Sequence, residues 1–144
     1  MGVIYSIIPV SEFSETGDIG GIDAELYLKD SSRSPSVVEL ENIVSSVARL
    51  AVEWFEGHDD SKIASISQTL NDQETLRTTL VIMNVSNEEK YGYYFEKGDR
   101  GLLVDLVHRI SKLCGCQVVC PDTVYSPVLV DPTLSPTKIL QTWG

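Results

Sequence analysis

Two histidines and three cysteines are the side chains of this sequence with the greatest capacity for covalent or acid–base chemistry. His58 precedes two aspartates, so a carboxylate could orient its ring as a catalytic base, although its position also fits an exposed loop residue. His108 lies off the apolar stripe of its expected helix, which predicts a place facing solvent or at the rim of the core. Neither histidine is accompanied by a Gly-x-Ser-x-Gly motif. We therefore expect no catalytic residue and no enzymatic activity.

The three cysteines, Cys114, Cys116 and Cys120, fall within seven positions. With His108 they could supply four soft zinc ligands, but zinc motifs pair ligands about two to four residues apart on a tight turn. Here Cys114 is expected on the core face of a helix, and Cys116 and Cys120 on one face of a strand. We therefore expect buried thiols, no metal and no cofactor. An odd, crowded set of cysteines is unlike a secreted disulfide framework and indicates a reducing cytoplasm.

Acidic residues dominate the charge, since 21 Asp and Glu against 11 Lys and Arg give a net charge of −10. This balance disfavours nucleic acid and anionic membranes as partners. Residues 1–60 hold twelve acids and three bases. Two explanations stay open, a solvated surface or an acidic patch that faces a basic partner. No apolar run reaches roughly 18 residues, the length of a membrane span, and the N-terminus lacks the basic residues of a signal peptide.

Four carboxylates and one tyrosine are the candidate contacts for a basic partner. Asp59 and Asp60 fall in one predicted turn, and Glu88 and Glu89 fall in another. Exposed carboxylates steer the encounter with a basic surface and set specificity more than they add affinity. Tyr94 lies on the strand face opposite three aromatic residues that are expected in the core, and tyrosine is enriched at binding hot spots.

The elements that must position these residues belong to one α+β domain over residues 1–144. We expect a mainly antiparallel sheet packed by two principal amphipathic helices, in the order β-β-α-β-β-β-α-β-β-α. Runs of apolar residues, most of them alternating with polar ones, predict the strands. The expected strands are residues 3–10, 24–29, three strands of a meander between 62 and 97, and residues 117–120 and 124–130.

The first helix is predicted over residues 35–56. Apolar residues recur at helical spacing from Val37 to Trp54. Ser34 is the expected N-cap, Pro35 suits the first helical position, and Gly57 suits the end.

Two further helices are predicted after the meander. Asp99 caps the first of these, which runs to about residue 114 and ends at Gly115. Ser135 and Pro136 open the last, which runs to about residue 142. Trp143 follows it, and this side chain either docks the helix on the body or stays free as a contact residue.

This general build resembles that of two groups of bacterial binding proteins. Immunity proteins of polymorphic and contact-dependent toxins are similar in size and often acidic, and residues 102–130 share their local pattern: an amphipathic helix that ends in Leu113-Cys114-Gly115, then two short strands. This resemblance implies a cytoplasmic protein that inhibits a cognate toxin by covering its active site, which is frequently basic.

Type III secretion chaperones are the alternative. They are similar to this chain in acidity, in length and in the order helix, three strands, helix, two strands, helix from residue 35 onward. The resemblance implies a homodimer formed through the segment from about Arg100 to Cys114, with a secreted effector as the partner. The sequence leaves the oligomeric state open.

Overall fold

The structure, a computed structural model, describes residues 3–12, 30–47, 49–71, 73–87, 89–122 and 126–143. Within these residues one sheet runs in the order β2-β3-β4-β5-β1-β6-β7, and every pairing is antiparallel. The predicted α+β class with an antiparallel sheet is therefore confirmed. The elements are β1 (Ile4–Pro9), the 3-10 helix η1 (Val10–Glu12), α2 (Val37–Ser46), β2 (Leu50–Glu56), β3 (Lys62–Asn71), β4 (Glu74–Met83), β5 (Gly92–Glu96), α3 (Arg100–Cys114), β6 (Gln117–Pro121), β7 (Val128–Val130) and α4 (Pro136–Thr142).

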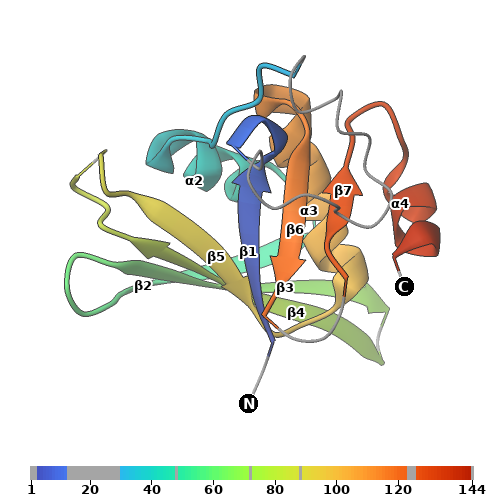
Figure 1. Cartoon of the computed structure of the whole chain (residues 1–144). Helices are drawn as coiled ribbons and strands as arrows, with labels where there is room; N and C mark the ends of the chain where they lie inside the picture. Colours follow the sequence, from blue (N-terminus) through green and yellow to red (C-terminus); the bar gives the residue numbers. More distant parts are fainter. Residues whose placement is uncertain are drawn as a thin grey trace.

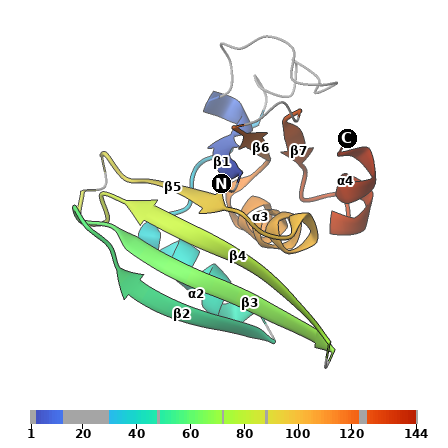
Figure 2. The ribbon, with the colours of Figure 1, turned by 90° about the horizontal axis from the view of Figure 1, so that it is seen from below.

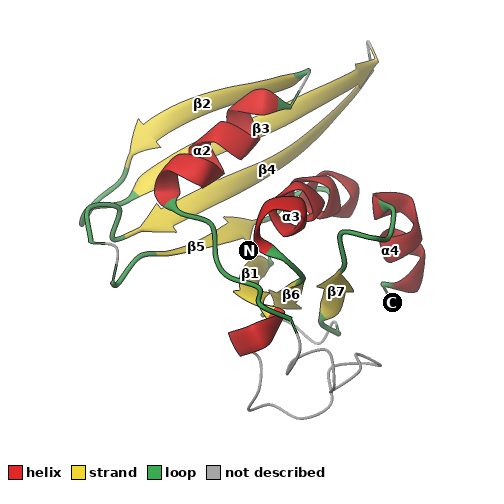
Figure 3. Ribbon diagram, turned by 90° about the horizontal axis from the view of Figure 1, so that it is seen from above, coloured by secondary structure: helices red, strands yellow, loops and turns green. Residues whose placement is uncertain are grey.

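The sheet twists so strongly that β1, β6 and β7 run across the direction of β3 and β4 (Figure 1). Seen from above, α2 crosses in front of β2, β3 and β4 (Figure 3); seen from below, the same strands lie in front of α2 (Figure 2). The helices thus cover one face of these strands, and the core lies between them. The predicted strand at residues 24–29 lies outside the described residues.

The predicted helix over residues 35–56 is wrong in its second half, because Leu50–Glu56 is the strand β2. Leu50 and Trp54 are four residues apart and fit a helical stripe, but with Val52 they also fit the period of a strand. All three are half-buried, whereas the alternating residues Ala51, Glu53 and Phe55 are exposed. Strand pairing with β3 along all seven residues satisfies the backbone groups that face β3, and β-branched and aromatic residues favour this state. Four strands, rather than the predicted three, therefore separate α2 from α3.

The start of α2 also differs from the prediction. Ser36, not Ser34, is the N-cap: its hydroxyl accepts from the backbone N–H of Glu39, and the Glu39 carboxylate accepts from the backbone N–H of Ser36. This is a reciprocal capping box, which Ser34 cannot form because the residue three positions later is Val37. Arg33 adds two hydrogen bonds to the same carboxylate, at 2.7 and 2.8 Å. These contacts lower the pKa of Glu39 to about 2, with the Arg33 bonds as the largest cause.

The meander and the second principal helix are confirmed. β3, β4 and β5 pair in sequence order, and α3 begins at its predicted cap, where Asp99 accepts from the backbone N–H of Leu102. Gly115 ends α3 with a φ of 89°, which favours glycine. The apolar stripe of α3 is buried against the sheet, and the helix also contacts α2 and α4.

His108 is buried, which corrects the prediction that it faces solvent or the rim. Its Nε2 lies 2.7 Å from the carbonyl oxygen of Leu134, in the segment that leads into α4. That segment covers a second side of α3, so a position off the main stripe is also enclosed. Trp143 docks α4 on the body: its indole N–H donates to the Ser126 carbonyl, and its ring meets Tyr5 edge-on at 5.9 Å.

Candidate functional site

The face of β2–β5 that points away from the helices carries an apolar row. Four residues on four neighbouring strands are direct cross-strand partners there: Phe55, Ile63, Val81 and Tyr94. Figure 2 views these strands from the side opposite α2. Phe55 is 52% exposed although it is large and apolar. We call this surface the open face.

A polar row runs beside the apolar one. Glu53, Ser65, Thr79 and Glu96 are its successive cross-strand partners, so a carboxylate stands at each end. Residues directly opposite each other in a sheet have neighbouring side chains, and each row is therefore continuous on the surface. The open face thus joins an apolar strip to a strip that ends in acids.

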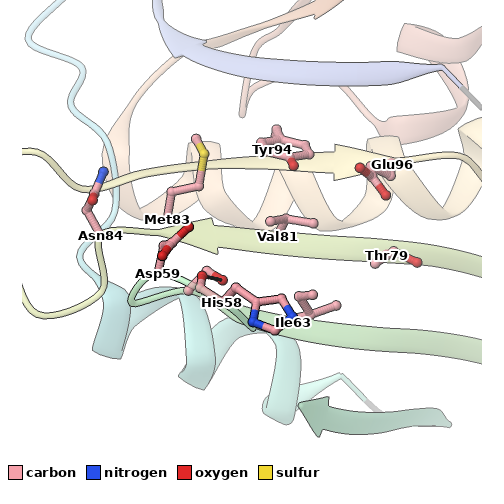
Figure 4. A pocket seen from close by; sticks show the side chains of 10 residues that line it. His58, Asp59, Ile63, Thr79, Val81, Met83, Asn84, Tyr94 and Glu96 are labelled. Carbon is pink, nitrogen blue, oxygen red and sulfur yellow. Dashed lines mark hydrogen bonds between the residues drawn. The ribbon is translucent and has the colours of Figure 1, made fainter. Parts of the chain in front are cut away.

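A pocket of about 480 Å³ lies where the two rows meet the β2–β3 turn. Ile63, Val81 and Met83 supply its apolar lining from β3 and β4, while Tyr94 and Glu96 come from β5 (Figure 4). The turn contributes further polar side chains. Among the described residues, the lining consists of His58, Asp59, Ser61, Ile63, Thr79, Val81, Met83, Asn84, Tyr94 and Glu96.

The charge of this pocket is acidic, since Asp59 and Glu96 carry carboxylates and the described lining residues include no Lys or Arg. The pKa of Tyr94 is raised, first by burial and then by the neighbouring Glu96 carboxylate, so its phenol is neutral at physiological pH. An apolar surface with carboxylates beside it suits Lys or Arg, whose long stems are apolar and whose ends are cationic.

The β2–β3 turn holds Asp59 and Asp60 in the left-handed region, with φ values of 57° and 62°. Asp tolerates this conformation better than most residues. The turn is closed by a hydrogen bond from the Gly57 N–H to the Ser61 carbonyl at 2.9 Å, and the Ser61 hydroxyl donates to the carbonyl of His58. The turn therefore holds His58 and Asp59 in the lining of the pocket (Figure 4).

Asp60 connects this turn to the loop between β4 and β5. Its carboxylate accepts from both the backbone N–H and the hydroxyl of Ser86, and its carbonyl accepts from the Val85 N–H at 2.9 Å. The bonds from Ser86 lower the pKa of Asp60. Asp60 therefore joins the β2–β3 turn to the loop between β4 and β5.

The predicted contact residues thus divide into separate groups. Asp59 and Tyr94 line the same pocket, whereas Asp60, the next residue of the turn, is hydrogen-bonded to Ser86. Glu89 is exposed in the loop between β4 and β5, and Glu88 lies outside the described residues. Prediction from sequence missed Glu96, which lines the pocket, and Phe55, which is the exposed end of the apolar row.

A signal for these missed residues existed in the alternation of β4. Val81 and Met83 interleave with the core residues Leu80 and Ile82, which indicates that both faces of this strand carry apolar surface. Only strand register, however, aligns those positions with Phe55 across the sheet.

The three thiols and the exposed His58 are further side chains with chemical capacity. The predicted burial of Cys114 and Cys116 is confirmed, and Cys120 is partly buried on the face that it shares with Val118. Burial raises the pKa of Cys116 to about 12, with a further contribution from Asp30, and that of Cys120 to about 11. Among the described residues, no three His, Cys, Asp or Glu side chains gather as a metal site. His58 is exposed, in agreement with the loop alternative.

Comparisons with known proteins add no relative. No protein family, no curated protein and no solved structure matches this chain. Within the part of the chain that the structure describes, no helix has both the length and the hydropathy of a membrane span.

Proposed function

We propose that this chain is an acidic cytoplasmic binding protein, an immunity protein that inhibits a cognate basic toxin by direct contact through the open face. The observation that carries the proposal is the pocket, where an apolar lining is combined with the carboxylates of Asp59 and Glu96 and where no described lining residue is Lys or Arg. Interfaces are strongest where aromatic and apolar anchors are surrounded by polar groups. Phe55 and Tyr94 are the anchors at the two ends of the apolar row.

The net charge of −10 supports the same partner chemistry. Opposite charge speeds the encounter of two proteins, and a toxin that acts on nucleic acid presents a basic active site. A protein that covers such a site needs acids on its surface but no catalytic group of its own. The open face meets this requirement.

The chaperone alternative is less well supported. It requires dimerisation through the segment from Arg100 to Cys114, but the apolar residues of α3 other than Leu113 are packed inside the chain, against the sheet, α2 and α4. In addition, four strands rather than three separate α2 from α3. A dimer through the apolar stripe of α3 would have to expose residues that are core in this fold.

The test is affinity capture of partners from cells that produce this protein, with light scattering to measure its mass in solution. Wild type is compared with the double variant Phe55→Ala/Tyr94→Ala, which removes both anchors. Leu113→Ala is the matched control, because Leu113 is also apolar and 49% exposed but lies on α3. We expect a basic protein to be captured by wild type and by the control and to be lost from the double variant.

The captured protein is then expressed alone and together with the chain. The proposal expects toxicity in the first case and its suppression in the second. A partner retained by the double variant would remove the open face from the proposal. A stable dimer that holds an extended secreted protein would replace inhibition with the chaperone function.

A further inference from the structure

The sheet has two edges, and they differ in how well they are protected. β7, at one edge, has three residues and contacts α4. β2, at the other edge, has seven residues, and among the described strands it pairs only with β3. Proteins usually blunt such edges with short strands, Lys, Pro or bulges. The β2 strand has no Lys and no Pro, and its pairing with β3 runs without a break in register.

The backbone groups of β2 that point outward can be identified from the turn. The Gly57 N–H donates to the Ser61 carbonyl, so residues 57, 55, 53 and 51 direct their backbone groups toward β3. In an antiparallel pair the intervening residues direct theirs to the opposite side. Val52, Trp54 and Glu56 therefore present N–H and C=O groups along the free edge of the sheet.

The side chains at this edge indicate what would cover it. On the open face the edge presents Glu53 and Phe55, and Phe55 ends the apolar row that leads to the pocket. On the other face it presents the half-buried Val52 and Trp54. The strand carries two acids, Glu53 and Glu56, and no base.

A basic segment suits this edge better than a second copy of the chain. A second copy of β2 would bring two more glutamates to an edge that already holds Glu53 and Glu56, and like charges opposed across a sheet are destabilising. A strand that alternates Lys or Arg with apolar residues places its cations beside Glu53 and its apolar side chains beside Val52 and Trp54.

We propose that β2 is a strand-addition site that receives an extended segment of alternating basic and apolar residues from the partner. This inference rests on the proposed function for the identity of that partner as a basic protein. Strand addition draws affinity from backbone hydrogen bonds and specificity from alternate side chains. The added strand would extend the open face beyond Phe55.

The probe is an N-acetylated seven-residue peptide that alternates lysine and valine, and its matched control alternates glutamate and valine. Backbone hydrogen exchange is followed residue by residue by NMR. We expect the saturating lysine peptide to slow exchange at Val52, Trp54 and Glu56 by about tenfold or more. The glutamate peptide should leave these three rates unchanged.

Proline at Val52 removes an outward N–H that the fold itself does not use, so Val52→Pro should abolish the protection at Trp54 and Glu56. Val52→Ala is its control, because it shortens the side chain but keeps the donor. If Val52→Pro does not fold, Glu56→Pro against Glu56→Gln makes the same comparison at an exposed position.

Absence of protection by the lysine peptide, or equal protection by both peptides, would overturn the strand-addition site. Protection that grows with protein concentration in the absence of peptide would replace it with a second copy. If the Val52→Pro variant still captures the same basic partner as wild type, the strand-addition site is refuted and the proposed function is kept. Capture of no basic partner, with the peptide result intact, would refute the proposed function and keep the edge site.

Discussion

Asp59 and Asp60 are adjacent carboxylates that the fold uses differently. Asp59 lines the pocket, whereas Asp60 accepts two hydrogen bonds from Ser86 and so connects two loops. A charge reversal at Asp60 would disturb the loops as well as the surface charge. Neutralisation of Asp59 and Glu96 therefore tests the proposed partner binding more directly than a change at Asp60.

The pH dependence of stability distinguishes the two aspartates. The pKa of Asp60 is lowered in the folded state, so its bonds stabilise the fold above its ordinary value of 3.8 and are lost as pH falls through the lower folded value. We expect Asp60→Asn to lower the urea midpoint at pH 7 and the difference from wild type to shrink below about pH 4. Asp59→Asn is the control, since Asn also tolerates a positive φ. An equal effect of both substitutions would contradict the assignment.

The reactivity of the three thiols is a second property that depends on single residues. Burial is the largest cause of the raised pKa at Cys114, Cys116 and Cys120, and at about 11 for Cys120 only roughly one molecule in a thousand is thiolate at pH 8. We expect almost no reaction with Ellman's reagent in the native state over minutes, and reaction of all three in guanidinium. Rapid native labelling of any one thiol would show that it is accessible and ionised.

At the scale of elements, the N-terminus of α2 depends on a single serine. The Ser36 hydroxyl and the Glu39 carboxylate cap each other's backbone donors. Loss of an N-cap destabilises a protein by about 1 kcal/mol, so Ser36→Ala should lower the free energy of unfolding by roughly that amount. Ser34→Ala, at the position that sequence alone favours, should change it little. Urea denaturation followed by circular dichroism measures both, and the reverse order of effects would place the cap at Ser34.

The elements that could be predicted from sequence are those whose signals are local. α3 has a cap, a full apolar stripe and an ending glycine within one segment, and each was usable without knowledge of the fold. Residues 47–56 could not be assigned, because Leu50 and Trp54 satisfy both periodicities and only pairing with the distant β3 decides between them. The burial of His108 depends in the same way on Leu134, which lies 26 residues further along the chain.

The candidate site was predictable only in part for the same reason. The turn positions of Asp59 and Asp60 follow from local composition, and the alternation around Tyr94 predicts which strand face it occupies. The neighbours Phe55, Val81 and Glu96 become visible only when the register of four strands is known. A binding surface built across strands is thus a non-local property, whereas a capped helix is a local one.

Trp143 connects the last helix to the sheet. Its buried ring meets Tyr5, lies 4.5 Å from the Arg100 guanidinium and donates a hydrogen bond to the Ser126 carbonyl. Trp143→Ala should destabilise the fold by about 3–5 kcal/mol, because a large buried aromatic ring leaves a cavity. Trp143→Phe keeps most of the packing and should cost about 1 kcal/mol for the hydrogen bond. Urea denaturation is the measurement, and an Ala variant as stable as wild type would mean that α4 is not docked through this ring.

At the scale of the whole molecule, the net charge of −10 would act mainly on the rate of encounter with the basic partner that we propose. Exposed charges are screened beyond about 8–10 Å at physiological salt, so attraction between two separated surfaces weakens as salt is added. Contacts made after docking, such as those of Phe55 and Tyr94, are apolar and depend less on salt. Association and dissociation should therefore respond differently to the same change in buffer.

We expect the association rate constant with the captured partner to fall by about tenfold or more between 0.05 and 0.5 M NaCl, with a much smaller change in the dissociation rate. Neutralisation by Asp59→Asn/Glu96→Gln should slow association at low salt and flatten this dependence, because it removes the two carboxylates of the pocket. Phe55→Ala/Tyr94→Ala should instead speed dissociation, since it removes anchors that act once the complex has formed. Stopped-flow or surface-based kinetics separate the two constants. Association that is insensitive to salt would mean that the acidity of this chain serves solvation and not recognition.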